Sequence, residues 1–171
     1  MQKNNIFLIG FMGVGKSTMA RRLAQHLKME LVEMDETIEA KQGMTINEIF
    51  AQKGEDGFRD IESALVERIS KRENMVVSCG GGAVLRADNV QNMKKSGKIV
   101  FLTATPQTIF ERVRYSTNRP LLNGNMNVEY IETLMEKRRS VYEAAADIVV
   151  TTDGKSEEEL LEVLKKNIIR L

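Results

Sequence analysis

Short apolar runs alternate with longer mixed segments along most of this chain. These runs are four or five residues long and lie at residues 6–9, 31–34, 75–79, 99–102 and 148–151. Short, mainly apolar runs of this kind are typical of strands in a parallel sheet whose two faces are both covered. The pattern therefore predicts five buried strands, separated by segments long enough to hold helices.

The segments between the runs carry the signals that begin, continue and end helices. Phe58, Ile61, Leu65 and Ile69 recur at steps of three and four residues and predict the buried face of one helix. On this spacing Arg59 and the nearby Glu62 lie beside the buried face. Helices are predicted over residues 16–27, 36–42, 46–53, 57–69, 87–95, 128–145 and 157–171, with a further helix beginning at residue 106.

Two capping boxes and several glycines set the boundaries of these helices. Thr45 with Glu48, and Ser156 with Glu159, have the spacing at which two side chains satisfy free amides at a helix start. Gly54 predicts a stop between two helices. From residue 115 to 127 the chain is polar and has no period, and loops of this length in compact domains are usually functional lids or disordered.

Strands that alternate with helices predict the fold class directly. We expect one domain over residues 1–171, a three-layer α/β/α fold around a five-stranded parallel sheet with right-handed crossovers. The loop over about residues 115–126 is predicted to be a lid. A chain of 171 residues with 42% hydrophobic content is sufficient for one well-packed domain.

The charge and the cysteine content restrict the expected cellular compartment and the expected binding partners. The formal net charge is +1, which gives no electrostatic basis for binding nucleic acid or a membrane surface. The one cysteine, Cys79, excludes an internal disulfide, fits a reducing compartment and is expected to be a small core residue. The start of the chain has no signal-peptide pattern, and no apolar run is long enough to span a bilayer. We therefore expect a cytoplasmic protein, and a monomer because no exposed apolar stripe is evident.

The strongest chemical signal directly follows the first apolar run. Residues 10–17 read Gly-Phe-Met-Gly-Val-Gly-Lys-Ser and match the phosphate-binding pattern G-x-x-x-x-G-K-[ST] at every fixed position. In this pattern Lys16 reaches the β- and γ-phosphates and the Ser17 hydroxyl ligates Mg²⁺. Backbone amides and the start of the next helix add positive character. The predicted nucleotide-binding residues of this loop are Gly13, Val14, Gly15, Lys16, Ser17 and Thr18.

Other polar groups follow the ends of the next two predicted strands. Glu33 and Asp35 lie at the end of the second strand, and a run of three glycines, residues 80–82, follows the third. Because ligands bind beyond the carboxyl ends of parallel strands, these groups are expected to converge with the phosphate loop. Together they indicate phosphoryl transfer to a small acceptor. A GTPase is less well supported because no N-K-x-D-type guanine reader is evident, and a Rossmann site because the loop has Gly-Lys-Ser in place of G-x-G-x-x-G.

An ordered set of short motifs is more specific than the phosphate loop. Asp35 is followed by Gly-Phe-Arg-Asp-Ile-Glu at residues 57–62, three glycines at 80–82 and Arg-Pro-Leu-Leu at 119–122. Arg138 then precedes Tyr142 by four residues. With this set, essentially the whole chain resembles the shikimate kinase family, within the nucleoside-monophosphate-kinase-like fold.

The resemblance implies ATP-dependent phosphorylation of the 3-hydroxyl of shikimate, on the route to chorismate and the aromatic amino acids. It implies that Lys16, Asp35 and Arg119 are catalytic, Asp35 by orienting or deprotonating the attacking hydroxyl and Arg119 by closing with the lid over the transferred phosphate. Substrate binding would lie mainly within about residues 35–62. The implied substrate-binding residues are Asp35, Arg59, Gly80, Gly81, Gly82 and Arg138, with the two arginines on the carboxylate. Arg112 is implied to pack against adenine, and Asp153 to lie in the loop that lines the adenine pocket.

The chain departs from the family at one position. The family usually has an aspartate two residues before Asp35, where it helps to hold the magnesium shell, and here the residue is Glu33. A glutamate still binds Mg²⁺ through water, so Ser17 and Glu33 are the expected metal residues.

Less specific interpretations stay open at this stage. Arg59 is placed to pair with Glu62 or Asp56 on a helix surface, and Arg138 lies in a basic run with Lys137 and Arg139. The nearest other enzymes are a gluconate kinase and a nucleoside monophosphate kinase of the same fold. A nucleotide-gated binding or regulatory module without turnover is the alternative from another class.

Overall fold

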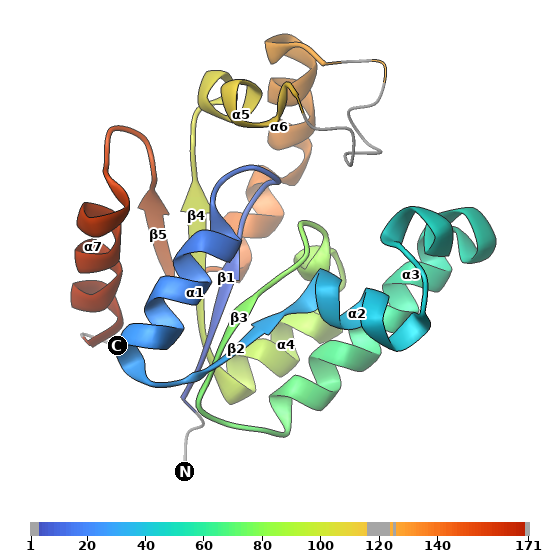
Figure 1. Ribbon diagram of the computed structural model, residues 1–171, viewed down its shortest axis with the longest axis horizontal. Helices are drawn as coiled ribbons and strands as arrows, with labels where there is room; N and C mark the ends of the chain where they lie inside the picture. The colour runs from blue at the N-terminus through green and yellow to red at the C-terminus, as the bar shows by residue number, and fades with distance from the viewer. Residues whose placement is uncertain (1–3, 116–123, 125, 170–171) are drawn as a thin grey trace.

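Five parallel strands form the centre of the protein (Figure 1). The computed structural model describes residues 4–115, 124 and 126–169. The strands lie side by side in the order β2-β3-β1-β4-β5, so the first strand of the chain occupies the middle of the sheet. Their bounds are β1 Asn5–Ile9, β2 Glu30–Glu33, β3 Met75–Ser78, β4 Gly97–Thr103 and β5 Ile148–Thr151.

Helices cover both faces of the sheet, as the alternation of elements along the chain predicts. The described helices are α1 Lys16–Leu27, α2 Met34–Gln42, α3 Ile46–Ser70, α4 Ala87–Ser96, α5 Pro106–Val113, α6 Val128–Ala145 and α7 Glu157–Ile169, with the short 3₁₀ helix η1 Ala83–Leu85. The three-layer α/β/α fold with a five-stranded parallel sheet is therefore confirmed. No helix within the described ranges is long and apolar enough to cross a membrane.

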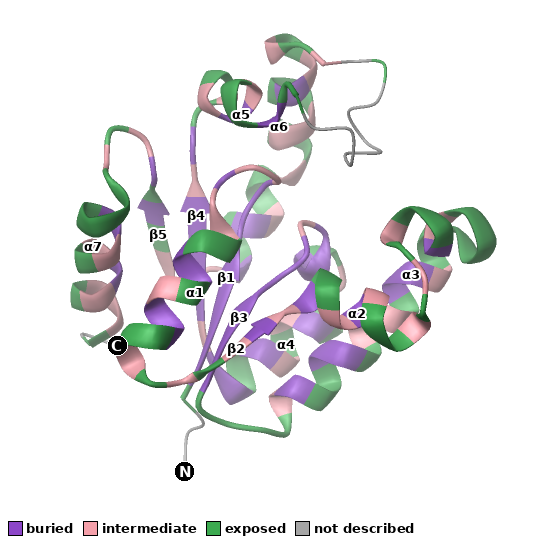
Figure 2. Cartoon of the chain, viewed as in Figure 1, coloured by how far each residue is buried: buried purple, intermediate pink, exposed green. Residues whose placement is uncertain are grey.

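Alternate residues of each strand supply two separate cores. In β1, Ile6 and Leu8 pack in the core that includes α1 and α7, whereas Phe7 and Ile9 pack in the core that includes α3, α4 and α6. All four side chains are at most 4% exposed, and Figure 2 shows the central strands buried along their length. Removing each side chain from water stabilises the fold by about 1.5–3 kcal/mol. The short apolar runs in the sequence reflect this burial on both faces.

The second strand ends earlier than its apolar run suggests. Glu33 has extended backbone angles and is the N-cap of α2, so Met34 and Asp35 belong to the first turn of that helix. A carboxylate in the first turn interacts favourably with the positive end of the helix dipole. The short connection places Asp35 at the rim of the sheet.

Helix α3 bends sharply at Gly54. The backbone there has φ 70° and ψ −179°, outside the helical region, so α3 consists of two helical segments that meet at Gly54, and the predicted stop at this glycine is confirmed. The expectation that Arg59 and Glu62 lie beside the buried face is wrong. Arg59 is 9% exposed and Glu62 is 0% exposed. The apolar period identified only the hydrophobic face, whereas the inner side of α3 also packs against the polar loop that follows β3.

Candidate active site

One cavity of about 1110 Å³ lies beyond the carboxyl ends of β1, β2 and β3. It brings together most of the residues that the sequence singles out. Those lining it are Gly13, Val14, Gly15, Lys16, Ser17, Thr18, Glu33, Asp35, Arg59, Gly80, Gly81, Gly82, Arg112 and Arg138. Asp153 is not among its lining residues, and Arg119 lies outside the described residues together with most of the predicted lid.

The phosphate loop has a backbone that side-chain-bearing residues rarely adopt. Gly13 has φ 78°, and a Cβ there would lie 2.6 Å from a Val113 methyl carbon. Gly15 has φ 103° and is the N-cap of α1, without a side chain that bonds to the helix amides. These amides and the helix start therefore face the cavity and favour an anion. The Lys16 ammonium group donates to the carbonyl oxygens of Gly10 at 2.7 Å and Phe11 at 3.0 Å, which holds its charge over the loop.

A group of oxygen ligands lies beside the phosphate loop. The Ser17 hydroxyl donates to Glu33 Oε2 at 2.9 Å and lies 3.4 Å from the Ser78 hydroxyl. The other carboxylate oxygen of Glu33, Oε1, is buried and has no hydrogen-bond partner. Oxygen ligands with a buried, unsatisfied carboxylate oxygen fit a hard divalent cation that also takes oxygens from phosphate and water. Across the described residues no cluster of three histidine, cysteine, aspartate or glutamate side chains forms an all-protein metal site.

Arg112 and Asp153 have different surroundings. The Arg112 guanidinium donates to the carbonyl oxygens of Gly13 at 3.2 Å and Val14 at 3.0 Å, so it supports the outer side of the phosphate loop. The Asp153 carboxylate accepts from the Thr105 amide at 2.8 Å and the Thr108 hydroxyl at 2.5 Å. Asp153 thus joins the loop after β5 to the start of α5.

The opposite end of the cavity contains two carboxylates beneath the triple glycine. A Cβ on Gly80 would lie 2.8 Å from Glu62 Oε2 and 3.0 Å from Asp35 Oδ1, so only a glycine allows both carboxylates this close. Asp35 is exposed to the cavity, whereas Glu62 is buried. Burial raises the pKa of Glu62, and the Arg59 guanidinium opposes this effect.

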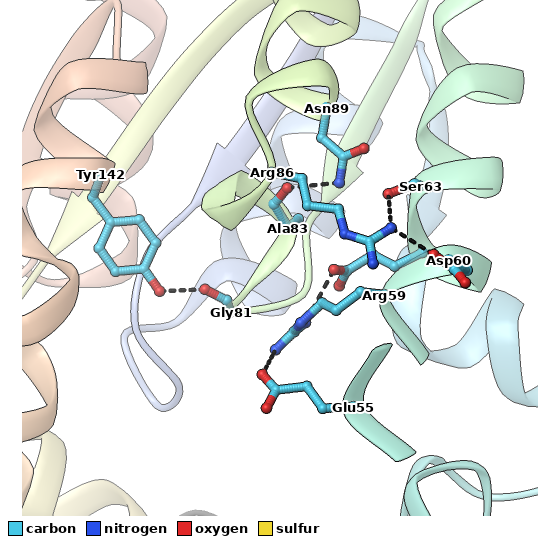
Figure 3. Close-up of polar contacts among 10 residues, drawn as sticks. Glu55, Arg59, Asp60, Ser63, Gly81, Ala83, Arg86, Asn89 and Tyr142 are labelled. Atoms are coloured by element: carbon cyan, nitrogen blue, oxygen red, sulfur yellow. Dashed lines mark hydrogen bonds and ion pairs between the residues drawn. The ribbon is translucent and has the colours of Figure 1, made fainter. Parts of the chain in front are cut away.

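Arg59 belongs to α3 and lines the same cavity. Its guanidinium donates to Glu62 Oε1 at 3.0 Å and lies 3.5 Å from Glu55 Oε1, and Figure 3 shows its contact with Glu55. The pairing with Glu62 anticipated from the sequence is therefore present, but in a buried position instead of on a helix surface. A Cβ on Gly82 would collide with three atoms of this guanidinium. The planar cation is thus held against the glycine loop, where Arg59 lines the cavity.

Arg138 approaches the same loop from α6. It is partly buried, whereas its neighbours Lys137 and Arg139 are exposed, so it does not belong to a solvated basic run. A Cβ on Gly81 would lie 3.5 Å from Arg138 Nη1. The two arginines therefore flank adjacent glycines and present two cations to one end of the cavity.

The sequence did not place Tyr142 in the site, and it indicated the pairing of Glu62 with Arg59 only on a helix surface. Glu62 pairs with Arg59 at the base of the site, and the Tyr142 hydroxyl donates to the Gly81 carbonyl oxygen. Both lie inside the motifs that carry the family resemblance, at the end of residues 57–62 and four residues after Arg138. Their positions were visible in the sequence, but their contacts depend on tertiary packing.

The cavity therefore has two chemically distinct ends. The phosphate-loop end offers amides, Lys16 and a cation site to a polyphosphate. The acceptor end, formed by Asp35, Arg59, Glu62, Gly80–Gly82 and Arg138, offers two guanidinium groups and a carboxylate to a small anionic molecule with hydroxyl groups. This combination suits phosphoryl transfer between two bound molecules.

Comparison with known proteins agrees with this geometry. The family model described as Shikimate kinase matches residues 12–168. A shikimate kinase of Thermodesulfovibrio yellowstonii is 43% identical over 167 residues, which covers 98% of this chain and 96% of the relative. One of Persephonella marina is 43% identical over 152 residues, covering 89% of this chain and 91% of the relative.

Solved structures give the same result. Shikimate kinase from Acinetobacter baumannii in complex with shikimate superposes with a TM-score of 0.92 at 32% identity, covering 98% of this chain and 94% of that one. A gluconokinase from Sinorhizobium meliloti has a TM-score of 0.65 at 21% identity, covers 98% of this chain and 93% of that one, and shares the fold alone. The P-loop kinase fold and the kinase class predicted from the sequence are confirmed. The chain belongs to the shikimate kinase family.

Proposed function

We propose that this chain transfers the γ-phosphoryl group of ATP to the 3-hydroxyl of shikimate. The observation that supports this most directly is the single cavity with a phosphate loop at one end and two arginines with Asp35 at the other. Shikimate carries one carboxylate and a ring of hydroxyl groups. Its charge and polarity therefore match the acceptor end of the cavity, and its phosphorylation would continue towards chorismate and the aromatic amino acids.

ATP would bind with its phosphates on residues 13–18 and Mg²⁺ beside them. The residues that would hold the cation are Ser17, directly, and Glu33, directly or through water, because their oxygens already lie together beside the phosphate loop. A divalent cation there would offset the charge of the β- and γ-phosphates. Lys16 would exchange its bonds to the loop carbonyls for the transferring phosphate.

The acceptor would be held by opposite charges and by backbone. Arg59 and Arg138 would bind the carboxylate, since each guanidinium offers paired N–H donors to an anion. The backbone of residues 80–82 would bond to the substrate, and Asp35 would orient or deprotonate the attacking hydroxyl. Positioned charges of this kind account for most of the catalysis in phosphoryl transfer.

The remaining assignments follow the resemblance and stay predictions. Arg119 would contact the transferring phosphate, so Arg119→Ala should lower kcat more than it raises the KM for shikimate. Arg112 and Asp153 would lie near the adenine. We expect the enzyme to act as a monomer in the cytoplasm.

A panel assay tests the proposal. ATP consumption is measured in the presence of Mg²⁺ with shikimate, gluconate, CMP and AMP as separate acceptors. We expect turnover with shikimate and only background consumption with the other three. Turnover with gluconate or a nucleotide in place of shikimate would overturn the proposal, as would nucleotide binding without turnover of any acceptor.

The Asp35→Asn variant connects the activity to this cavity. An amide still bonds to hydroxyl groups but cannot accept their proton, so shikimate binding measured by calorimetry should persist while kcat falls steeply. The exposed Asp60→Asn variant on α3 is the control for the same change in side chain. An equal kcat in the parent and in Asp35→Asn would remove Asp35 from the reaction.

A further inference from the structure

Tyr142 makes a contact that the proposed reaction does not by itself require. The residue lies in α6 and is 2% exposed. Its ring stacks on Phe101 of β4 with ring centroids 5.0 Å apart, so its position in the core is set by packing. Its hydroxyl donates to the Gly81 carbonyl oxygen, and Figure 3 shows the side chain directed from the helix towards the loop. A buried ring is thus aimed at the middle of the triple glycine.

The peptide between Gly81 and Gly82 is the group that this contact orients. In a trans peptide the carbonyl and the following N–H point in opposite directions. A bond from Tyr142 to the Gly81 oxygen therefore directs the Gly82 N–H away from α6. The same peptide lies between the two arginines, with Arg138 next to Gly81 and Arg59 next to Gly82.

Nothing in the glycines themselves selects this orientation. A peptide flanked by glycines has no Cβ to restrict its backbone angles, so several orientations have similar energy. Hydrogen bonds between Ala83 N–H and Gly80 O at 3.1 Å, and between Leu85 N–H and Gly82 O at 3.1 Å, hold the two ends of the turn. The first of these bonds closes a turn whose central peptide is Gly81–Gly82, and the tyrosine hydroxyl bonds to this peptide from outside the loop.

We propose that Tyr142 is a positioning residue, whose hydroxyl fixes the Gly81–Gly82 peptide so that the Gly82 N–H and the two flanking guanidinium groups face the acceptor together. This role rests on the proposed phosphorylation of shikimate. Arg138 lies one helical turn before Tyr142, so α6 supplies both a charged ligand and the anchor of the loop that the ligand borders. Burial raises the pKa of Tyr142 and the neighbouring Arg138 guanidinium opposes this effect, so the hydroxyl remains a protonated donor near neutral pH, as in an ordinary tyrosine.

The test compares Tyr142→Phe with Tyr130→Phe. The first variant removes only the hydroxyl and keeps the stacked ring, and the second makes the same chemical change in the first turn of the same helix, where Tyr130 packs with the other core. Steady-state kinetics are measured for both substrates. We expect Tyr142→Phe to raise the KM for shikimate roughly tenfold, because one buried hydrogen bond and the pre-set orientation are lost. The KM for ATP should stay within about twofold of the parent, as both constants should in Tyr130→Phe.

A structural role alone would give a different result. General loosening of the core would lower the melting temperature and change both KM values together, so equal shifts in the two constants would overturn the proposal. So would a KM for shikimate in Tyr142→Phe that matches the value in Tyr130→Phe.

A measurement without substrate separates this inference from the proposed function. The amide resonances of Gly81 and Gly82 are assigned by NMR in the unliganded parent and in both variants. We expect Tyr142→Phe to shift the Gly82 amide and Tyr130→Phe to leave it in place. A Gly82 amide that does not shift in Tyr142→Phe would overturn the proposed role of Tyr142 even if the parent phosphorylates shikimate. If Tyr142→Phe shifts the Gly82 amide as expected but the parent does not phosphorylate shikimate, the proposed function would be refuted and the role of Tyr142 in positioning the loop would stand.

Discussion

The two ends of the cavity are built in opposite ways. The phosphate-loop end comes from eight consecutive residues, 10–17, and the contacts of Lys16 with Gly10 and Phe11 span six and five positions. The acceptor end is assembled from α2, α3, α6 and the loop after β3, and its bond between Tyr142 and Gly81 spans 61 positions. One end is a local backbone conformation, whereas the other is a product of tertiary packing.

This difference separates the general part of the reaction from the specific part. A polyphosphate is recognised by amides and a helix start, which any sequence with the correct glycines supplies. In the proposed function the acceptor would be recognised by side chains that other buried side chains hold in place, as Glu62 holds Arg59. A gluconokinase shares the fold of this chain, and a shared fold does not by itself determine which acceptor is bound.

The largest effect is expected at the phosphate-loop end of the cavity. Lys16→Met should lower kcat by at least about a thousandfold, because a positive charge over the transferring phosphate is lost. Shikimate binding, measured by calorimetry, should change little, since the acceptor end does not depend on this ammonium. The exposed Lys41→Met variant on α2 is the control. Activity near that of the parent in folded Lys16→Met would show that the loop is not a catalytic phosphate site.

The second-largest effect is expected at the acceptor end, where substitutions of Arg138 and its neighbour in the sequence, Arg139, are compared. Removing one member of a close, desolvated charge pair costs roughly 2–5 kcal/mol, so Arg138→Ala should weaken shikimate binding by about tens-fold to thousands-fold. Arg139 is 62% exposed and pairs with Glu136 at 2.8 Å, so Arg139→Ala should have almost no effect. ATP affinity should be similar in both variants. Equal shikimate affinities in the two variants would show that Arg138 does not bind the shikimate carboxylate.

The same division explains what could be predicted from the sequence. The five strands, the helices and the phosphate loop follow from local signals, since apolar runs, caps and glycines act over a few residues. The convergence of Asp35, Arg59, Gly80–Gly82 and Arg138 was also expected, from the strand ends and the family resemblance. The burial of Arg59 and Glu62 was not, because the helical period of apolar residues carries no information about a polar loop that packs on the same helix.

Some features are visible in the sequence but not interpretable from it. Tyr142 stands four residues after Arg138, yet nothing local shows that it bonds to Gly81. Similarly, Glu33 replaces the aspartate usual in the family, and only the structure shows that its carboxylate reaches the Ser17 hydroxyl at 2.9 Å. The extra methylene therefore does not remove the carboxylate from the proposed metal site.

A smaller effect is expected at Glu33, beside the phosphate loop. Glu33→Gln should raise the Mg²⁺ concentration needed for half-maximal activity by about tenfold to a hundredfold, because a charged oxygen beside Ser17 is lost. Glu30→Gln, at the other end of β2 and paired with Arg72 on the surface, is the control. The measurement is a Mg²⁺ titration of activity at saturating ATP and shikimate. The same requirement in both variants would place the cation away from Glu33.

The smallest effect concerns stability, and it determines whether burial or ion pairing governs Glu62. Its pKa is raised from the ordinary value of 4.5, because burial outweighs the Arg59 guanidinium, and Asp35 adds repulsion. A raised pKa in the folded state means that the favourable contribution is complete below the ordinary pKa. It is lost as the pH rises through the raised pKa, because the folded state must then hold a buried charge. The free energy of unfolding of the parent minus that of Glu62→Gln should therefore fall with rising pH and then level off.

Glu67 on the same helix gives the opposite sign and serves as the control. It is exposed, and its hydrogen bond with Lys71 lowers its pKa, so its contribution is present above the ordinary pKa and lost as the pH falls. Denaturant unfolding of the parent, Glu62→Gln and Glu67→Gln across pH 4 to 8 measures both differences. We expect the Glu62 difference to fall and the Glu67 difference to rise slightly over this range. If the free energy of unfolding of the parent minus that of Glu62→Gln rose with pH, the ion pair with Arg59 would outweigh desolvation. The pKa of Glu62 would then be lowered instead of raised.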